Sequence, residues 1–255
     1  MCAFFIFFRL SLLSRSQLAD AQKYYGAGYL EGFINQRLIF AAVFNFANSS
    51  TVAPVTAGMT TLINGQLQWM QQNVKSMAAS DPYWARVGTV LQQYEGIIAG
   101  YQAAAPAKES LTRIQLLAYV LQFEIGDYAA AASRSALVRF DAHGRRHAVD
   151  HKHPVFMSNQ GRRRLEGEHC SVLVKPSANG EKLLAGHVTW SSLNTMLRVY
   201  KTYDFPNGKV QFSSFPGLPV SGDDWFITNH QLMVTETTNE IFNMSLYQYL
   251  TQQTM

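Results

Sequence analysis

The apolar residues of this chain change their spacing near its middle, and this change constrains the fold more than any other feature. In the first half they recur every three or four positions, which places them on one face of a helix. After residue 170 the apolar runs are short and are separated by turn residues, which is typical of β-strands. Helices followed by strands predict an α+β domain built of packed layers.

The predicted helical region spans residues 20–130. The stretch from Asp20 to about Phe46 has no proline and is rich in Ala, Leu and Tyr, so we expect it to be helical. Further apolar stripes precede Pro106, and a last one ends near Gly126. The stripes are Ile63, Leu67, Met70, Val74 and Met77; Trp84, Val87, Leu91, Tyr94, Ile98 and Tyr101; and Leu111, Ile114, Ala118, Leu121 and Ile125. We interpret these Met and aromatic residues as core and not as a cofactor site.

The strand-rich region begins with a predicted hairpin. Strands at 171–175 and 183–189 flank Asn179-Gly180, a dipeptide that favours a tight turn. Ser191 or Ser192 is then expected to cap a helix. The apolar residues of that helix are Leu193, Met196, Leu197 and Tyr200. Further strands are predicted at 210–215, 225–228 and 232–237.

Cys170 is the candidate nucleophile of the chain. It begins the first predicted strand, and His187 lies at the end of the next strand. The other cysteine is Cys2, at the extreme N-terminus, so Cys170 has no obvious disulfide partner. A single cysteine with a histidine elsewhere in the sequence is compatible with nucleophilic catalysis. The alternative is a cysteine that packs as a small hydrophobic side chain.

Several motifs, found in one order, resemble the phospholipase B-like family, the lysosomal and secreted proteins related to lamina ancestor. The motifs are His169–Lys175, Gly186–Ser192, Met196–Lys201, Phe212–Gly217, Ser221–Ile227 and Val234–Asn239, with weaker matches at Gly28–Gly32 and Gly126–Asp127. The resemblance covers residues 166–250 closely and 20–130 loosely.

The family is similar to the N-terminal nucleophile hydrolases, so the resemblance implies an αββα sandwich of two sheets between helical layers. It also implies that the precursor cuts its own His169–Cys170 bond, which leaves Cys170 with a free α-amine. A thiol with a pKa of about 8.5 is mostly protonated at neutral pH, and an α-amine with a pKa near 8 can accept its proton. The thiolate would then attack an acyl carbonyl and form a thioester. Esters and amides pass through the same type of intermediate, so both remain open as substrates.

The resemblance carries over three more site residues. His187 is expected to bind the attacking group or the oxyanion, Trp190 to form a wall of the pocket, and Thr238 to contribute a pocket hydroxyl. The alternatives are a core histidine, a packed indole and a strand hydroxyl. The implied substrate is a phospholipid or an acyl amide, and the mechanism needs neither a metal ion nor another cofactor.

Residues 131–169 form a basic segment that we interpret as a linker or propeptide. The net charge of the chain is +4 and much of the excess lies in 134–164, which argues against a nucleic-acid partner that binds a general basic surface. His143 and His147 have the spacing of a metal pair on a helix. Gly144 lies between them and no helix is evident, so a linker is the better interpretation.

The N-terminal residues and two sequons favour a secretory route. Residues 1–19 are apolar but too short to span a membrane, and we interpret them as a leader or a degraded signal peptide. Asn48 and Asn243 each begin an Asn-X-Ser sequon, so both are candidate glycosylation sites. We therefore expect a secreted or lysosomal protein.

Members of the family are longer than this chain, and their C-terminal halves supply further strands and pocket residues. Residues 170–255 are therefore expected to form an incomplete, nucleophile-bearing part of the sandwich. Three hypotheses remain open: a hydrolase represented by its N-terminal portion, a truncated or degenerate relative without activity, and a secreted or lysosomal lipid-binding protein. The expected partners are the missing half or an oligomer partner, and a lipid surface contacted peripherally.

Overall fold

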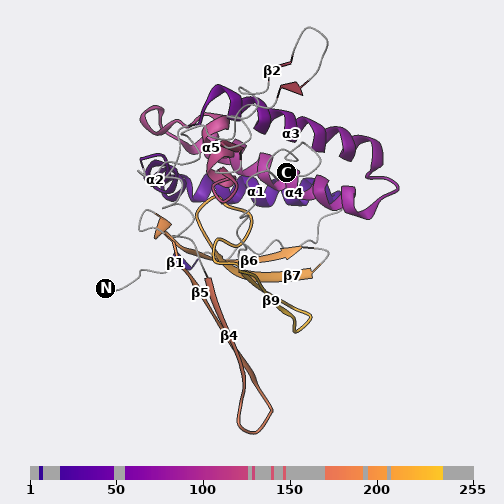
Figure 1. Ribbon diagram of the computed structural model, residues 1–255, viewed down its shortest axis with the longest axis vertical. Helices are drawn as coiled ribbons and strands as arrows, with labels where there is room; N and C mark the ends of the chain where they lie inside the picture. The colour runs from indigo at the N-terminus through magenta and orange to yellow at the C-terminus, as the bar shows by residue number, and fades with distance from the viewer. Residues whose placement is uncertain are drawn as a thin grey trace.

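The computed structural model describes residues 6–7, 18–48, 55–125, 128–129, 139–140, 146–147, 170–191, 195–205 and 208–237. Within this part of the chain, a layer of helices covers one side of a five-stranded sheet, and a long hairpin extends away from both (Figure 1). The α+β class expected from the change in spacing is confirmed. The two-sheet sandwich stays a prediction.

The helical layer contains five α-helices in the described residues. They are α1 (Asp20–Ile34), α2 (Gln36–Ala47), α3 (Ala57–Met77), α4 (Pro82–Ala104) and α5 (Arg113–Val120), with a 3₁₀ turn at Ala107–Glu109. Side chains of Thr56, Asp81 and Thr112 accept hydrogen bonds from backbone N–H groups in the first turns of α3, α4 and α5. None of these helices combines the length and the apolar content that crossing a membrane requires.

The stretch from Asp20 to about Phe46 is helical as expected, and it divides at Asn35, whose side chain donates to the Glu31 carbonyl oxygen at the end of α1. Two other helix predictions need correction. α5 ends at Val120, before the predicted end near Gly126. The predicted helix over residues 193–200 is wrong at its C-terminal end, because Val199 begins strand β6. Pairing with a neighbouring strand decides that segment, and local spacing does not reveal such pairing.

The five-stranded sheet has the order β1-β6-β7-β8-β9. Its strands are β1 (Ile6–Phe7), β6 (Val199–Phe205), β7 (Gly208–Ser214), β8 (Trp225–Thr228) and β9 (Met233–Thr235), and β1 is parallel to β6 while the others pair antiparallel. A separate two-residue pair joins β2 (Arg139–Phe140) to β3 (Arg146–His147). The strands predicted at 210–215, 225–228 and 232–237 are confirmed in position.

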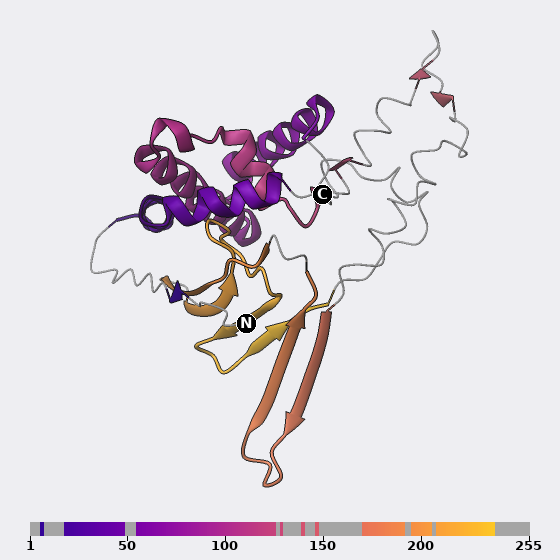
Figure 2. The same ribbon diagram turned by 90° about the vertical axis from the view of Figure 1, so that its left-hand side faces the viewer.

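The predicted hairpin is also confirmed. Strand β4 (Cys170–Pro176) pairs antiparallel with β5 (Leu183–Thr189) along its whole length. The turn between them places Gly180 at φ 72°, a conformation that glycine adopts without strain. Figure 2 shows this hairpin projecting from the body of the protein. Its apolar side chains are largely exposed, with Leu173 68% and Leu183 71% accessible.

Helices α1 and α4 pack with their backbones in direct contact. A methyl group at Gly28 would lie 1.9 Å from the Gln93 carbonyl oxygen, and one at Gly96 would lie 2.1 Å from the Tyr25 carbonyl oxygen. Gly32 and Gly100 make equivalent contacts one turn further along. Only glycine permits so close an approach of the two helix backbones. The two glycines of each helix are four residues apart, which places them on one face of that helix, toward the other helix.

A buried ion pair joins the helical layer to the sheet. The ammonium group of Lys201, in β6, donates to Glu31 Oε1 of α1 and to the Leu218 carbonyl oxygen, both at 2.6 Å. The Tyr203 hydroxyl donates to the other oxygen of Glu31, also at 2.6 Å. The Lys201 and Glu31 side chains are 2% and 1% exposed, so each charge depends on this network for compensation.

Candidate active site

Strands β4 and β5 bring the predicted nucleophile and the predicted histidine onto one face of the hairpin. Cys170 lies opposite Thr189, and His187 lies opposite Val172. Side chains of directly opposed residues point to the same face, and alternate residues of a strand share that face. Cys170, His187 and Thr189 are therefore neighbours because of the register that the turn imposes.

Asp224 forms a cluster with Cys170 and His187, and it was not predicted from the sequence. It lies directly before β8, and its Oδ2 is 3.6 Å from the Cys170 sulfur, which donates to it. One polar atom each of Cys170, His187 and Asp224 lies within 4.8 Å of the others, and all three residues are half-buried. The available signal was the pair of aspartates within the motif Ser221–Ile227, in a segment between strands where functional residues concentrate.

The loop before β8 holds Asp224 in an uncommon conformation. Its φ is 56°, in the left-handed region that non-glycine residues seldom adopt. The Ser221 hydroxyl accepts hydrogen bonds from the backbone N–H groups of Asp223 and Trp225, both at 3.2 Å. The same hydroxyl donates to the Ser213 carbonyl oxygen at 3.0 Å. One serine therefore fastens the residues on both sides of Asp224 to strand β7.

The neighbouring carboxylate, Asp223, anchors the loop through its charge. Arg198 donates from Nε to both Asp223 oxygens at 2.9 Å, and the Ser213 hydroxyl donates to one of them. The Arg198 guanidinium also lies 4.2 Å from the centre of the Phe215 ring. Asp223 is thus neutralised by a cation, whereas Asp224 faces the sulfur.

The hydrogen bonds of His187 define its tautomer. Nε2 lies 3.0 Å from the Glu236 carbonyl oxygen, which can only accept, so Nε2 carries the proton. In a neutral ring Nδ1 then bears the lone pair, and the Thr189 hydroxyl donates to it at 3.3 Å. The Glu236 N–H donates to the Asp224 carbonyl oxygen at 3.0 Å. The chain after β9 thereby links the histidine to the aspartate loop.

Burial raises the pKa of the Cys170 thiol above its ordinary value. The charge and the hydrogen bond of Asp224 and the charge of Glu236 raise this pKa further, while the Trp190 backbone N–H opposes the shift. Burial also raises the pKa of the Asp224 carboxyl, an effect that the Cys170 hydrogen bond and the His187 charge oppose. In this arrangement the thiol stays protonated at neutral pH, so nucleophilic chemistry requires an additional base.

Trp190 is near the cluster through its backbone. Its N–H is close enough to the Cys170 sulfur to lower the thiol pKa, but its side chain is 55% exposed. Its predicted role as a wall of the pocket stays a prediction. The predicted residues His169 and Thr238 lie outside the described residues, and so does the bond between His169 and Cys170.

Of the two sequon asparagines and the two histidines of the predicted metal pair, the structure describes Asn48 and His147. Asn48 is exposed directly after α2, where its side-chain amide donates to the Phe44 carbonyl oxygen at 2.8 Å. Asn243 and His143 lie outside the described residues, and His147 is described only as part of β3.

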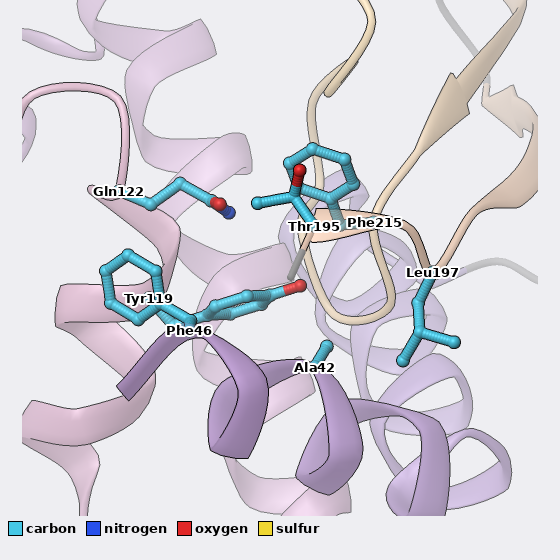
Figure 3. A pocket seen from close by; sticks show the side chains of 7 residues that line it. All are labelled: Ala42, Phe46, Tyr119, Gln122, Thr195, Leu197 and Phe215. Atoms are coloured by element: carbon cyan, nitrogen blue, oxygen red, sulfur yellow. The ribbon is translucent and has the colours of Figure 1, made fainter. Parts of the chain in front are cut away.

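A small cavity lies between the helices and the segment that leads into β6 (Figure 3). Its lining residues are Ala42, Phe46, Tyr119, Gln122, Thr195, Leu197 and Phe215. The volume is about 10 Å³, which is room for about one water molecule. The Tyr119 hydroxyl and the Gln122 amide nitrogen, both at this cavity, are buried and lack a hydrogen-bond partner at normal distance within the described residues. A water molecule suits this space, and an acyl chain does not.

Comparison with known proteins gives a consistent family. The model of the family described as Phospholipase B matches residues 7–255. Phospholipase B-like protein E of Dictyostelium discoideum is 29% identical in an alignment 258 residues long, and this alignment covers 96% of this chain and 44% of the relative. Phospholipase B of Crotalus adamanteus is 28% identical in an alignment 236 residues long, and this alignment covers 87% of this chain and 40% of the relative. The chain spans about two fifths of the length of these curated relatives.

Proposed function

The chain belongs to the phospholipase B-like family, and from this premise we propose that it is the nucleophile-bearing part of an acyl hydrolase. The observation that carries the proposal is the convergence of Cys170, His187 and Asp224 within 4.8 Å of one another. The proposed substrates are the acyl chains of phospholipids or of related acyl amides. Both classes present a carbonyl carbon to a sulfur nucleophile.

Cleavage of the His169–Cys170 bond is the proposed activation step. Before cleavage the Cys170 nitrogen is an amide, which is not a base, and the thiol has a raised pKa. Cleavage converts this nitrogen into an α-amine, which titrates near pH 8 and accepts a proton at physiological pH. The new amine is part of the same residue as the thiol, so base and nucleophile meet without a further conformational change.

The proposed reaction then runs in two steps. The α-amine takes the thiol proton, the thiolate attacks the acyl carbonyl, and the resulting tetrahedral intermediate expels an alcohol or amine that receives that proton. This leaves a thioester on Cys170. Water, deprotonated by the same amine, attacks the thioester and releases the carboxylic acid, and the sulfur recovers its proton.

The neighbouring side chains have supporting roles in this proposal. Asp224 accepts the thiol hydrogen bond and so orients the sulfur, which makes it a positioning residue. His187 is held in one tautomer by Glu236 and is available to the attacking group or the oxyanion. Trp190 and Thr238 are proposed to line the pocket, as the family resemblance implies.

We extend the proposal to architecture and location. The β4–β5 hairpin would belong to one sheet of an αββα sandwich, and its exposed apolar side chains are compatible with burial in such a sheet. The protein would be secreted or lysosomal and glycosylated at Asn48 and Asn243. The exposed position of Asn48 permits attachment of a glycan.

A lipid-binding protein without catalysis is the second candidate. The observation that favours it is the same hairpin, which presents exposed leucines and valines on both of its faces. Exposed apolar surface of this kind is also a feature of lipid-contacting proteins. Lipid binding that is unaffected by Cys170→Ala, in a chain that never cleaves itself, would favour this candidate.

Intact-mass spectrometry with N-terminal sequencing tests the proposal. The full chain would be expressed through a secretory route and then shifted to acidic pH. We expect a fragment that begins Cys170-Ser171-Val172. Cys170→Ala should abolish both cleavage and hydrolysis, and Cys170→Ser should retain slow cleavage but lose most turnover, because a hydroxyl ionises less readily than a thiol.

Two controls make the result specific. Cys2→Ala removes the other cysteine and should leave cleavage unchanged. His187→Ala should alter the rate or its pH profile. An uncut parent chain, or hydrolysis that persists in Cys170→Ala, would refute the assignment of Cys170 as the nucleophile.

A further inference from the structure

The cluster around Cys170 contains the donor atoms of a metal site. A thiol, an imidazole and a carboxylate each contribute one atom, and these atoms lie within 4.8 Å of one another. With metal–donor distances of about 2.0–2.3 Å, neighbouring donors of a tetrahedral zinc ion lie roughly 3.5 Å apart. The sulfur of Cys170 and Oδ2 of Asp224, at 3.6 Å, already have this separation. The His187 donor lies within 4.8 Å of both of these atoms, so the ring would need to approach them by up to about 1.3 Å to complete the set.

The chemistry of these donors selects zinc among the common divalent ions. Magnesium and calcium prefer sites made of oxygen atoms, whereas zinc binds sulfur, nitrogen and carboxylate oxygen together. Three protein ligands leave a fourth position for water, as in many zinc sites that are not purely structural. The three residues come from β4, β5 and the loop before β8, so the fold itself and not a local sequence repeat assembles the set.

The surroundings of His187 match those of a zinc-binding histidine. Such a histidine commonly donates its second ring N–H to a backbone carbonyl, which fixes the tautomer and leaves the other nitrogen free to bind the ion. The Nε2–H of His187 donates to the Glu236 carbonyl oxygen in this way, so the lone pair is on Nδ1. Thr189, which now donates to Nδ1, has a hydroxyl that can rotate away.

The charges near the cluster also favour a cation. Asp224 faces the sulfur, and Glu236 is close enough to act on it electrostatically. The nearest arginine among the residues named in this network, Arg198, is already paired with Asp223. A divalent cation would compensate the negative charge that a thiolate and Asp224 create together.

We propose that Cys170, His187 and Asp224 bind a zinc ion in the uncleaved chain and that the bound ion masks the Cys170 sulfur. On binding, the thiol releases its proton to solvent and the sulfur forms a bond to zinc, with no change of oxidation state. The binding does not depend on the proposed hydrolase function. That the bound zinc reversibly inhibits a catalytic nucleophile does rest on the proposed hydrolase function.

Cobalt and zinc titrations test this site directly. The full chain carrying Cys2→Ala, purified without a histidine tag, would be titrated with Co²⁺, which reports sulfur ligation through a thiolate-to-metal absorption band. We expect this band to appear and to disappear when zinc displaces cobalt. Cys170→Ser should abolish the band, and His187→Ala and Asp224→Asn should each weaken binding at least about tenfold. His230→Ala, at an exposed histidine outside the cluster, should leave the affinity unchanged.

Alkylation of Cys170 by iodoacetamide gives a second readout that needs no enzyme activity. Saturating zinc should slow alkylation at least about tenfold, and a chelator should restore the original rate. Protection should be lost in His187→Ala and Asp224→Asn but kept in His230→Ala, and circular dichroism would verify that each variant is folded. Since only sulfur ligation produces the thiolate-to-cobalt band, cobalt bound by histidines elsewhere would not imitate it, and zinc bound there would not protect Cys170 from alkylation.

The outcomes separate the two proposals. Absence of the band in the parent chain, or unchanged affinity in both His187→Ala and Asp224→Asn, would overturn the zinc site. Binding without protection of the sulfur would overturn the masking. Binding with protection in a chain that never cleaves itself or hydrolyses an acyl substrate would leave the zinc site established and contradict the proposed hydrolase.

Discussion

Among the described side chains, Asp224 has the strongest effect on the pKa of the Cys170 thiol. Its carboxyl accepts the thiol hydrogen bond, and its negative charge opposes formation of a second negative charge on the sulfur. The backbone of Asp224 lies in the left-handed region, at φ 56°. Backbone outliers of this kind cost about 1–3 kcal/mol and persist where surrounding contacts hold them, often at functional sites.

Asp224→Asn should lower the pKa of the Cys170 thiol, because it removes a negative charge while leaving the burial in place. The thiol would then become reactive at a lower pH. The rate of alkylation of Cys170, measured against pH in Cys2→Ala protein with a chelator present, reports this pKa. Glu181→Gln removes the same charge from the exposed hairpin turn and should leave the profile in place. Identical profiles for Asp224→Asn and the parent would contradict the assigned role of Asp224.

Glu31 and Lys201 form an ion pair whose two charges are both buried, so each charge lacks water and is compensated only by its protein partners. Lys201→Met leaves the Glu31 carboxylate without its cation, and we expect a loss of about 3–5 kcal/mol in the free energy of unfolding. The double variant Glu31→Gln with Lys201→Met should lose less than the sum of the two single variants, because no isolated charge remains. Denaturant unfolding measures all of these values.

Lys23→Met serves as the control for the buried pair. Lys23 pairs with Asp20 on the first turns of α1, where the aspartate is about half exposed. Its loss should change the free energy of unfolding by about 0–1 kcal/mol. Equal effects of Lys23→Met and Lys201→Met would show that the buried network contributes no more than a surface ion pair.

At the scale of elements, the contact between α1 and α4 determines how the helical layer meets the sheet. Gly28 and Gly32 on α1 face Gly96 and Gly100 on α4, and backbone carbonyls fill the space where methyl groups would otherwise lie. Close approach of the two helices leaves the other side of α1 to pack on the sheet, where Ala27 contacts Tyr203 and Phe212. The same helix carries Glu31 to Lys201.

Gly96→Ala should destabilise the protein, because the added methyl group would lie 2.1 Å from the Tyr25 carbonyl oxygen. Overpacking of a well-filled interface costs about 1–3 kcal/mol, and we expect the upper part of this range because backbone atoms must move. Gly26→Ala, on α1 itself, meets nothing within 4 Å and should gain up to about 1 kcal/mol from helix propensity. Thermal and denaturant unfolding compare the two, and a neutral Gly96→Ala would show that the helices can separate at little cost.

At the scale of the whole molecule, the core depends on several tyrosines that must remain neutral. Burial raises the pKa of Tyr94, Tyr119 and Tyr203 well above the ordinary value of 10.0, and it raises the pKa of Tyr128 to about 12. The unfolded chain releases these protons near pH 10, whereas the folded chain retains them. The folded state therefore binds more protons above that pH, and the free energy of unfolding must fall as pH rises.

Tyr128→Phe should make this loss of stability less steep. Between about pH 10 and pH 12, one tyrosine contributes a slope of up to about 1.4 kcal/mol per pH unit, and the variant lacks that contribution. Denaturant unfolding at several alkaline pH values measures the slope. Tyr83→Phe, at a side chain that is 65% exposed, should retain the slope of the parent. The same slope in both variants would mean that Tyr128 does not remain protonated in the fold.

The sequence by itself determines the features that depend on neighbours within a few positions. Spacing of three and four residues predicts the apolar faces of α3 and α4, and the Asn179-Gly180 dipeptide predicts the turn that pairs β4 with β5. That hairpin register in turn places Cys170 and His187 on one face, so their proximity was predictable. Local sterics and backbone hydrogen bonds act over such short separations and require no knowledge of the remaining chain.

Tertiary structure alone decides the features that join distant residues. Val199 begins a strand because β7 pairs with it, although its neighbours also suit a helix. Asp224 meets Cys170 across 54 residues, and Glu31 meets Lys201 across 170. Such contacts form only when packing brings separate elements together, and the free energy that selects them comes from burial and charge compensation in the assembled core. No local pattern of residues contains that information, which is why the proximity of Cys170 and His187 was predictable and the position of Asp224 beside them was not.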